Sequence, residues 1–174
     1  ELTEIPVYCT MPGKSAFDDR HPLALGSGSA STSLPARKWL QESDVLFAVG
    51  SSMTRTGYGQ PIPGGKVIIQ NVESIEDINK DFSVDVGLPG DAKLTLQALV
   101  DEVKSQLGAN GRKGQSDVAK EIADLHDAWM GEWTDILNSE DVPINTYRII
   151  GELERTLDKE NSIVTHDAGA PRDT

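Results

Sequence analysis

Two continuous apolar runs constrain the fold of this chain more than any other feature: residues 44–50 (DVLFAVG) and residues 66–72 (KVIIQNV). A strand with one face in water alternates apolar and polar side chains, whereas a strand covered on both faces reads as an unbroken apolar run. Strands of the second kind belong to parallel sheets with helices on both faces. The two runs therefore predict a parallel α/β sheet.

Helical segments alternate with these strands. Residues 34–42 form one predicted helix, and Pro35 suits its first turn because the N–H that proline lacks would have no partner there. Residues 91–107 form a longer one, with Asp91 as N-cap, leucines and valines at helical spacing, and Gly108 as its stop. Shorter elements are predicted at residues 5–10 (strand), 74–80 (helix) and 83–88 (strand). Since crossovers between parallel strands are right-handed, this order predicts a Rossmann-like parallel sheet flanked by helices, and its abrupt start indicates truncation at the N-terminus.

The composition changes after the second long helix. Residues 108–115 (GANGRKGQ) are polar and glycine-rich and read as a linker that ends a first domain over residues 1–107. Residues 116–174 contain two further predicted helices, at 116–138 and 145–157, the second capped by Asn145. A strand from residue 162 then runs into a Gly/Pro turn. We interpret residues 116–174 as a helical connection and the truncated start of a second α/β domain.

Charge and composition exclude several classes of protein. The formal net charge is −12, from 16 Lys and Arg against 28 Asp and Glu, which disfavours binding to nucleic acid. No window approaches the roughly 20 apolar residues of a membrane helix. The single cysteine, Cys9, cannot form an internal disulfide and fits a cytoplasmic protein; its place in a predicted strand favours a core role. The three histidines have no zinc-ligand spacing, so no metal site is predicted.

One small-residue segment could bind a nucleotide. Gly26, Ser27 and Gly28 begin like a dinucleotide fingerprint, but the third glycine is missing from the residues that follow, up to Ser33. Backbone N–H groups in such a loop before a helix can hold a phosphate, and loops of this composition are also commonly plain turns. The residues leave both interpretations open.

Two polar groups follow predicted strands. Glu73, Glu76 and Asp77 come after the second apolar run, where an acidic residue could bind a ribose hydroxyl; an exposed, capped helix start is the favoured interpretation. His166 and Asp167 follow the last predicted strand, at the end of a strand where open α/β sheets place ligands.

Several stretches resemble one enzyme family. Residues 5–26 (IPVYCTMPGKSAFDDRHPLALG), 42–50 (ESDVLFAVG), 67–80 (VIIQNVESIEDINK) and 85–99 resemble the central domain of thiamine-diphosphate-dependent enzymes of the acetolactate synthase, pyruvate decarboxylase and benzoylformate decarboxylase type. Residues 144–148 and 162–174 resemble the opening of the family's C-terminal, diphosphate-binding domain. The resemblance covers nearly the whole chain in the order of the family.

The resemblance implies a chemistry and also implies what this chain lacks. Family members use thiamine diphosphate and Mg²⁺ to decarboxylate, cleave or join 2-oxo acids and related substrates. The activating glutamate and the Mg²⁺-binding motif belong to parts of the family's chains that are not in this sequence, so no catalytic or metal-binding residue is expected here. The segment that resembles the turn nearest the diphosphate supplies the candidate thiamine diphosphate contacts: Asp167, Gly169, Ala170, Pro171 and Arg172.

Departures from the family pattern bear on a second cofactor. Some members bind FAD or ADP in the central domain. Acetolactate synthases usually carry Arg-Phe-Asp-Asp-Arg where this chain has residues 52–56 (SMTRT), and Asp-Pro where it has Ser74 and Ile75. These departures disfavour FAD or ADP at Gly26 and Gly28, and favour a decarboxylase or lyase relative over a true acetolactate synthase.

Two functions from different classes follow. The first is an inactive structural fragment whose partners are the missing N- and C-terminal domains of the same enzyme, itself a homodimer or homotetramer acting on a small molecule. The alternative is a free-standing FAD- or ADP-binding regulatory module that uses residues 26–33.

Overall fold

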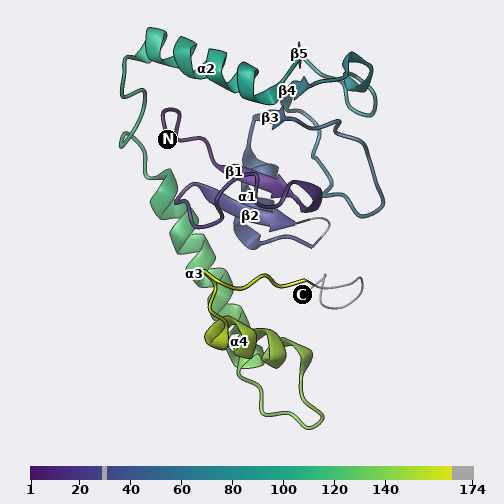
Figure 1. Cartoon of the computed structure of the whole chain (residues 1–174), viewed down its shortest axis with the longest axis vertical. Helices are drawn as coiled ribbons and strands as arrows, with labels where there is room; N and C mark the ends of the chain where they lie inside the picture. Colours follow the sequence, from purple (N-terminus) through teal and green to yellow (C-terminus); the bar gives the residue numbers. More distant parts are fainter. Residues whose placement is uncertain (29–30, 166–174) are drawn as a thin grey trace. The chain divides into compact units, whose positions relative to one another are not determined.

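The computed structural model describes residues 1–28 and 31–165, and the chain divides into two compact units. Unit 1 spans Glu1–Ala123 and unit 2 spans Asp124–Thr174. Unit 1 contains every strand of the described residues (Figure 1). Within those residues no helix is both long and apolar enough to cross a membrane.

The strands of unit 1 form two parallel sheets. In the first, β1 (Val7–Thr10) pairs with β2 (Ala24–Gly28). In the second, β4 (Val67–Val72) lies between β3 (Val45–Val49) and β5 (Val86–Pro89). All three strand pairings are parallel, which confirms the predicted α/β class and the two strands read from the apolar runs.

The helices of unit 1 begin where the sequence predicts. Helix α1 (Leu34–Glu42) has Pro35 in its first turn, and the Ser33 hydroxyl accepts a hydrogen bond from the Ala36 N–H at 3.3 Å. Helix α2 (Ala92–Leu107) is capped by Asp91, whose carboxylate accepts from the Leu94 N–H at 2.9 Å. These contacts satisfy N–H groups that have no partner within the helix.

An apolar core lies between the first sheet and two helices. Leu23 and Leu25 of the β2 region pack with Ala36 of α1 and Ile122 of α3 (Val118–Leu137), all of them buried. Burial of apolar side chains is the main favourable term in folding, so this cluster is the principal stabilising element of the β1–β2 region. The predicted core position of Cys9, on β1, is confirmed by its burial.

Strand β2 was not expected from the sequence. We expected residues 25–33 to form a small-residue loop, whereas residues 24–28 are a strand with Leu25 and Gly28 buried. Glycine and serine have low strand propensity, so the segment lacks a local strand signal. Its pairing with β1 supplies the stabilisation that the local sequence does not.

Three shorter elements also differ. Residues 74–80 contain only one 3₁₀ turn, η2 (Ile75–Asp77), and Ser74 makes no side-chain cap. The strand expected at 83–88 is β5, which begins three residues later. The strand expected from residue 162 is absent over residues 162–165, where the described chain has no regular structure. A second 3₁₀ turn, η1 (Met11–Gly13), follows β1.

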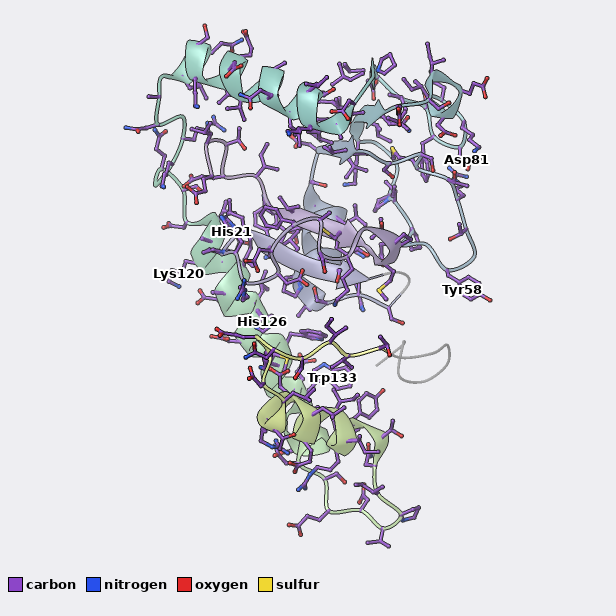
Figure 2. All side chains as sticks on the ribbon, in the orientation of Figure 1. His21, Tyr58, Asp81, Lys120, His126 and Trp133 are labelled. Carbon is purple, nitrogen blue, oxygen red and sulfur yellow. The ribbon has the colours of Figure 1, made fainter. Side chains whose placement is uncertain are left out.

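Unit 2 contains the later part of α3 and helix α4 (Thr146–Thr156). The predicted cap is confirmed, since the Asn145 side chain accepts from the Tyr147 N–H at 2.9 Å. Trp129 and Trp133 share a face of α3 with ring centroids 6.2 Å apart, and the Trp133 ring lies 5.2 Å from that of Tyr147 (Figure 2). The contact between Trp133 and Tyr147 joins α3 to α4.

Candidate functional site at the carboxyl ends of β3, β4 and β5

A pocket of about 540 Å³ opens where the three strands of the second sheet end. The residues that line it come from the end of β4, from the segments that follow the three strands, including η2, and from the start of α2. Gly50, Ser52, Glu73, Asp77, Gly90 and Asp91 are among them. In open parallel sheets, ligands bind outside the carboxyl ends of the strands. The pocket therefore occupies the position in this fold where a ligand site is expected.

A buried amide fixes the backbone around this pocket. Asn71 of β4 is fully buried, and its side-chain oxygen accepts from the Gly50 N–H at 3.3 Å. Its side-chain nitrogen donates to the carbonyls of Leu88 and Gly90, at 2.9 and 3.1 Å, and to the Thr95 hydroxyl at 3.1 Å. Asn71 thus connects the ends of all three strands to α2. This side chain therefore fixes the positions of Gly50 and Gly90, two of the residues that line the pocket.

A second buried amide, Gln70, makes hydrogen bonds on the other face of β4. Gln70 is 1% exposed, and its nitrogen donates to the carbonyls of Ser51 and Asp77 at 2.9 and 3.3 Å. These contacts attach the segment after β3 to η2. Neither amide was identified from the sequence, although two polar residues inside an otherwise apolar strand are a signal that could have found them.

The segment after β3 is held at a second point. The Arg55 backbone N–H donates to the carboxylate of Asp81 at 2.8 Å (Asp81 in Figure 2). The Arg55 guanidinium lies 4.5 Å from the centre of the Phe82 ring. A guanidinium over an aromatic face is attracted to the ring electrons. Residues 51–65 are therefore attached to the turn before β5 as well as to β4.

The charges around the pocket are negative. Glu73, Asp77 and Asp91 line it, and no lysine or arginine is among the described residues that do so. Asp91 already occupies the amino end of α2, the position at which a helix can bind a phosphate. Carboxylates accept hydrogen bonds from hydroxyl groups and repel phosphates, so the pocket suits a hydroxylated ligand better than a diphosphate.

Only part of the acidic cluster expected from the sequence, Glu73, Glu76 and Asp77, lies at the pocket. Glu73 and Asp77 both line the pocket, whereas Glu76 does not. Asp77 also forms an ion pair with Lys80, 3.1 Å between the charged atoms. The helix start that we favoured for these residues is one short 3₁₀ turn, and of its two acidic residues only Asp77 lines the pocket.

Gly26 and Gly28 lie on strand β2, outside this pocket. A Cβ atom on Gly28 would lie 2.7 Å from the Ser31 carbonyl oxygen, and Gly26 has a φ of +87°. The Ser33 hydroxyl donates to the Leu25 carbonyl at 2.8 Å. A positive φ thus accounts for Gly26 and a close approach of the chain accounts for Gly28, and their binding of a nucleotide stays a prediction.

The other candidate contacts cannot be placed. Asp167, Gly169, Ala170, Pro171 and Arg172 lie outside the described residues, as does His166. In the part of the chain that is described, no group of three or more His, Cys, Asp or Glu side chains could hold a metal ion. Binding of thiamine diphosphate by residues 167–172 remains a prediction.

Curated relatives of the chain carry related names. The chain is 29% identical, over 97% of its length, to a probable acetolactate synthase large subunit of Methanococcus aeolicus, and covers 29% of that protein. It is 33% identical, over 73% of its length, to an acetolactate synthase of Mycobacterium avium, covering 20% of it. It is also 25% identical, over 99% of its length, to a 3D-(3,5/4)-trihydroxycyclohexane-1,2-dione hydrolase of Bacillus anthracis, covering 30%.

The chain therefore spans less than a third of the length of these relatives. Its residues 1–99 match the family profile described as "Thiamine pyrophosphate enzyme, central domain". The matched segment includes both parallel sheets and the first half of α2. It also contains every described residue named above as lining the pocket. On this match, the chain belongs to the thiamine pyrophosphate enzyme family, with residues 1–99 in its central domain.

Proposed function

We propose that this chain supplies the central-domain scaffold of a thiamine-diphosphate- and Mg²⁺-dependent enzyme acting on 2-oxo acids or related substrates, and is inactive alone. The family match over residues 1–99 carries the proposal. The names of the relatives and the small share of their length that this chain spans support it. In the whole enzyme the missing N- and C-terminal domains would be its partners, in a homodimer or homotetramer.

The charge of the pocket supports a scaffold role for the described part of the chain. A diphosphate placed there would meet the carboxylates of Glu73, Asp77 and Asp91. The described lining residues therefore do not fit the diphosphate of thiamine diphosphate, FAD or ADP. We propose instead that residues 167–172, with Asp167 and Arg172, approach the diphosphate in the whole enzyme, where the bound cofactor supplies a nucleophile and an electron sink.

The type of reaction can be proposed more specifically, as either carbon–carbon bond formation or decarboxylation and cleavage. The relatives named acetolactate synthase favour carbon–carbon bond formation. Residues 52–56 and the Ser74-Ile75 pair depart from the acetolactate synthase pattern and favour a decarboxylase or lyase. We propose the second type. A synthase that joins two 2-oxo acids also releases CO₂, so assays of the whole enzyme for a product with a new carbon–carbon bond against a released aldehyde would separate the two.

Thermal unfolding with added ligands tests the scaffold role. The chain is heated alone and with thiamine diphosphate plus Mg²⁺, FAD, ADP or NADP⁺, each at a large excess. A ligand that binds only the folded chain stabilises it by about 2.7 kcal/mol at a hundredfold excess over its dissociation constant, which shifts Tm measurably. We expect no shift from FAD, ADP or NADP⁺, and no turnover of a 2-oxo acid by the chain alone.

Two results would contradict this expectation. A shift with FAD or ADP would support the nucleotide-binding module instead. Gly28→Ala would then show whether residues 26–33 are the site, because the added Cβ would lie 2.7 Å from the Ser31 carbonyl oxygen. Turnover by the isolated chain would overturn the scaffold role altogether.

A further inference from the structure

The segment between α2 and α3, residues 108–117, is docked onto the N-terminal segment of unit 1 (Figure 1). The Arg112 N–H donates to the Leu2 carbonyl at 2.8 Å, and the Gly114 N–H donates to the Glu4 carboxylate at 2.6 Å. Glu1 and Lys113 form an ion pair at 2.8 Å. The polar, glycine-rich composition of residues 108–115 predicts a linker. The contacts that hold this segment in place therefore need an explanation of their own.

The segment folds into consecutive turns that present its N–H groups to residues 1–4. Gly108, Gly111 and Gly114 all have positive φ, and the Gln115 N–H donates to the Arg112 carbonyl at 3.0 Å. Glu4 itself has a φ of +53°, which costs free energy in a residue with a side chain. Glu4 is thus a hydrogen-bond acceptor with a strained backbone conformation. Such strain persists only where neighbouring contacts enforce it, so the bond from the Gly114 N–H helps to keep Glu4 in this conformation.

The fit is closest at Gly111. A Cβ atom there would lie 2.3 Å from the Leu2 carbonyl oxygen, and Gly111 is buried. At Gly114, which also has a positive φ, a Cβ atom would meet nothing within 4 Å. The two glycines therefore differ in one respect: only Gly111 needs the absence of a side chain for docking.

We propose that residues 108–117 form a latch: a docked strap, held by the Glu4 carboxylate and the Leu2 carbonyl, that opens without unfolding of the rest of unit 1. Its contacts are hydrogen bonds and one exposed ion pair, and most of its residues are exposed. Segments with little apolar burial open locally at lower free energy than the core does. The strap leads into α3, whose Val118 and Ala119 pack against the core and whose Ile122 lies in it, so opening ends before α3 and leaves that core intact.

Limited trypsin digestion of the full chain tests the latch, because Arg112 and Lys113 are cleavage sites within it. Arg37 and Lys38 of α1 report on unfolding of unit 1. Cleavage follows the population of the open state when opening is fast, so Gly111→Ala and Glu4→Ala should each raise cleavage after Arg112 and Lys113 about tenfold. Cleavage after Arg37 and Lys38 should not change. Mass spectrometry of the fragments separates the two sets.

Two matched controls make the test decisive. Gly114→Ala adds the same unfavourable left-handed conformation without the collision, so its effect should be clearly smaller than that of Gly111→Ala. Glu140→Ala removes an exposed carboxylate elsewhere in the chain and should have no effect. Equal effects at Gly111 and Gly114, a parallel rise at Arg37 and Lys38, or rapid cleavage of the unsubstituted strap would each overturn the latch. Ligand binding is not involved, so the result is independent of the proposed function.

Discussion

Around β1 and β2 the buried side chains are apolar, with Leu23 and Leu25 packed on Ala36 and Ile122. In the middle strand of the other sheet, the most completely buried side chains are two amides, Gln70 at 1% and Asn71 at 0% exposure. Apolar contacts have no preferred direction, whereas an amide bonds only to donors and acceptors at defined positions. The first region gains stability from its buried side chains, and the second gains a fixed backbone at the ends of its strands.

The position of the pocket follows from this contrast. Gly50 and Gly90 line it, and both are hydrogen-bonded to Asn71. The hydrogen bonds of Asn71 favour one backbone arrangement, and removal of this side chain leaves several backbone groups unpaired. We expect the two regions to respond differently to substitution, and four experiments examine this difference.

The largest effect is expected at Asn71. Asn71→Leu keeps a similar volume but leaves the Gly50 N–H and the carbonyls of Leu88 and Gly90 without their partner, so it should lower the free energy of unfolding by about 3–5 kcal/mol. Urea denaturation measures the loss. Gln97→Leu, at an exposed amide of α2, is the control and should change it by about 0.5 kcal/mol or less. Equal losses at the two positions would remove the contrast.

The apolar core should respond next. Leu25→Ala leaves a cavity beside Ala36 and Ile122 and should lower the free energy of unfolding by about 2–4 kcal/mol. Leu96→Ala on α2, where the side chain is 40% exposed, should lose clearly less. The same urea titrations provide both values. A small loss at Leu25 would mean that this cluster is not the main stabilising element of its region.

A smaller loss is expected at Gly28, the last residue of β2. Gly28→Ala places a Cβ 2.7 Å from the Ser31 carbonyl oxygen and should lower the free energy of unfolding by about 1–3 kcal/mol. Gly57→Ala, with open space at its Cβ, should be neutral or stabilise by about 0.4–1 kcal/mol. Thermal unfolding of the two variants side by side is sufficient. A neutral Gly28→Ala would show that Ser31 can move away from the added Cβ.

The smallest effect concerns pH. The side chain of Arg20 donates to the Asp18 carboxylate at 3.0 Å and, with the Arg20 N–H, lowers the pKa of Asp18 from 3.8 to about 2. A carboxyl group with a lowered pKa in the folded state stabilises that state above its unfolded pKa, and this contribution is lost as the pH falls through about 2. Since Asp18 is exposed, the contribution is small.

Asp18→Asn should therefore lower stability slightly at pH 6 and not at pH 2. Thermal unfolding at the two pH values tests this difference, and Asp19→Asn is the neighbouring control. A larger effect of Asp18→Asn at pH 2 than at pH 6 would contradict the assignment.

The signals that worked were those with a local physical cause. The unbroken apolar run of residues 44–50 predicted β3 as a strand of a parallel sheet, and the strand and its parallel pairing are confirmed. The burial expected on both faces is not observed, because Val45 and Val49 are exposed. Asp91 and Asn145 were recognisable as caps because a helix start leaves N–H groups that a short polar side chain can satisfy. The family resemblance, which rests on ordered motifs, is confirmed by the match over residues 1–99.

The signals that failed depended on partners distant in the sequence. Strand β2 has a small-residue sequence that reads as a loop, and its pairing with β1 makes it a strand. The strap at residues 108–117 has the composition of a free linker, and its contacts come from residues 1–4. In both cases the decisive contacts join groups far apart in the sequence, which no local pattern distinguishes.

The sequence by itself determined the α/β class, the family, and most helix and strand positions, because hydrophobic periodicity and capping act within a few residues. Only the tertiary structure decided where the pocket lies and how it is built. Asn71 acquires its role from Gly50 and Gly90, which approach it from other strands when the sheet forms. An amide in an apolar strand is costly until those partners are in place, so its purpose becomes evident only in the folded chain.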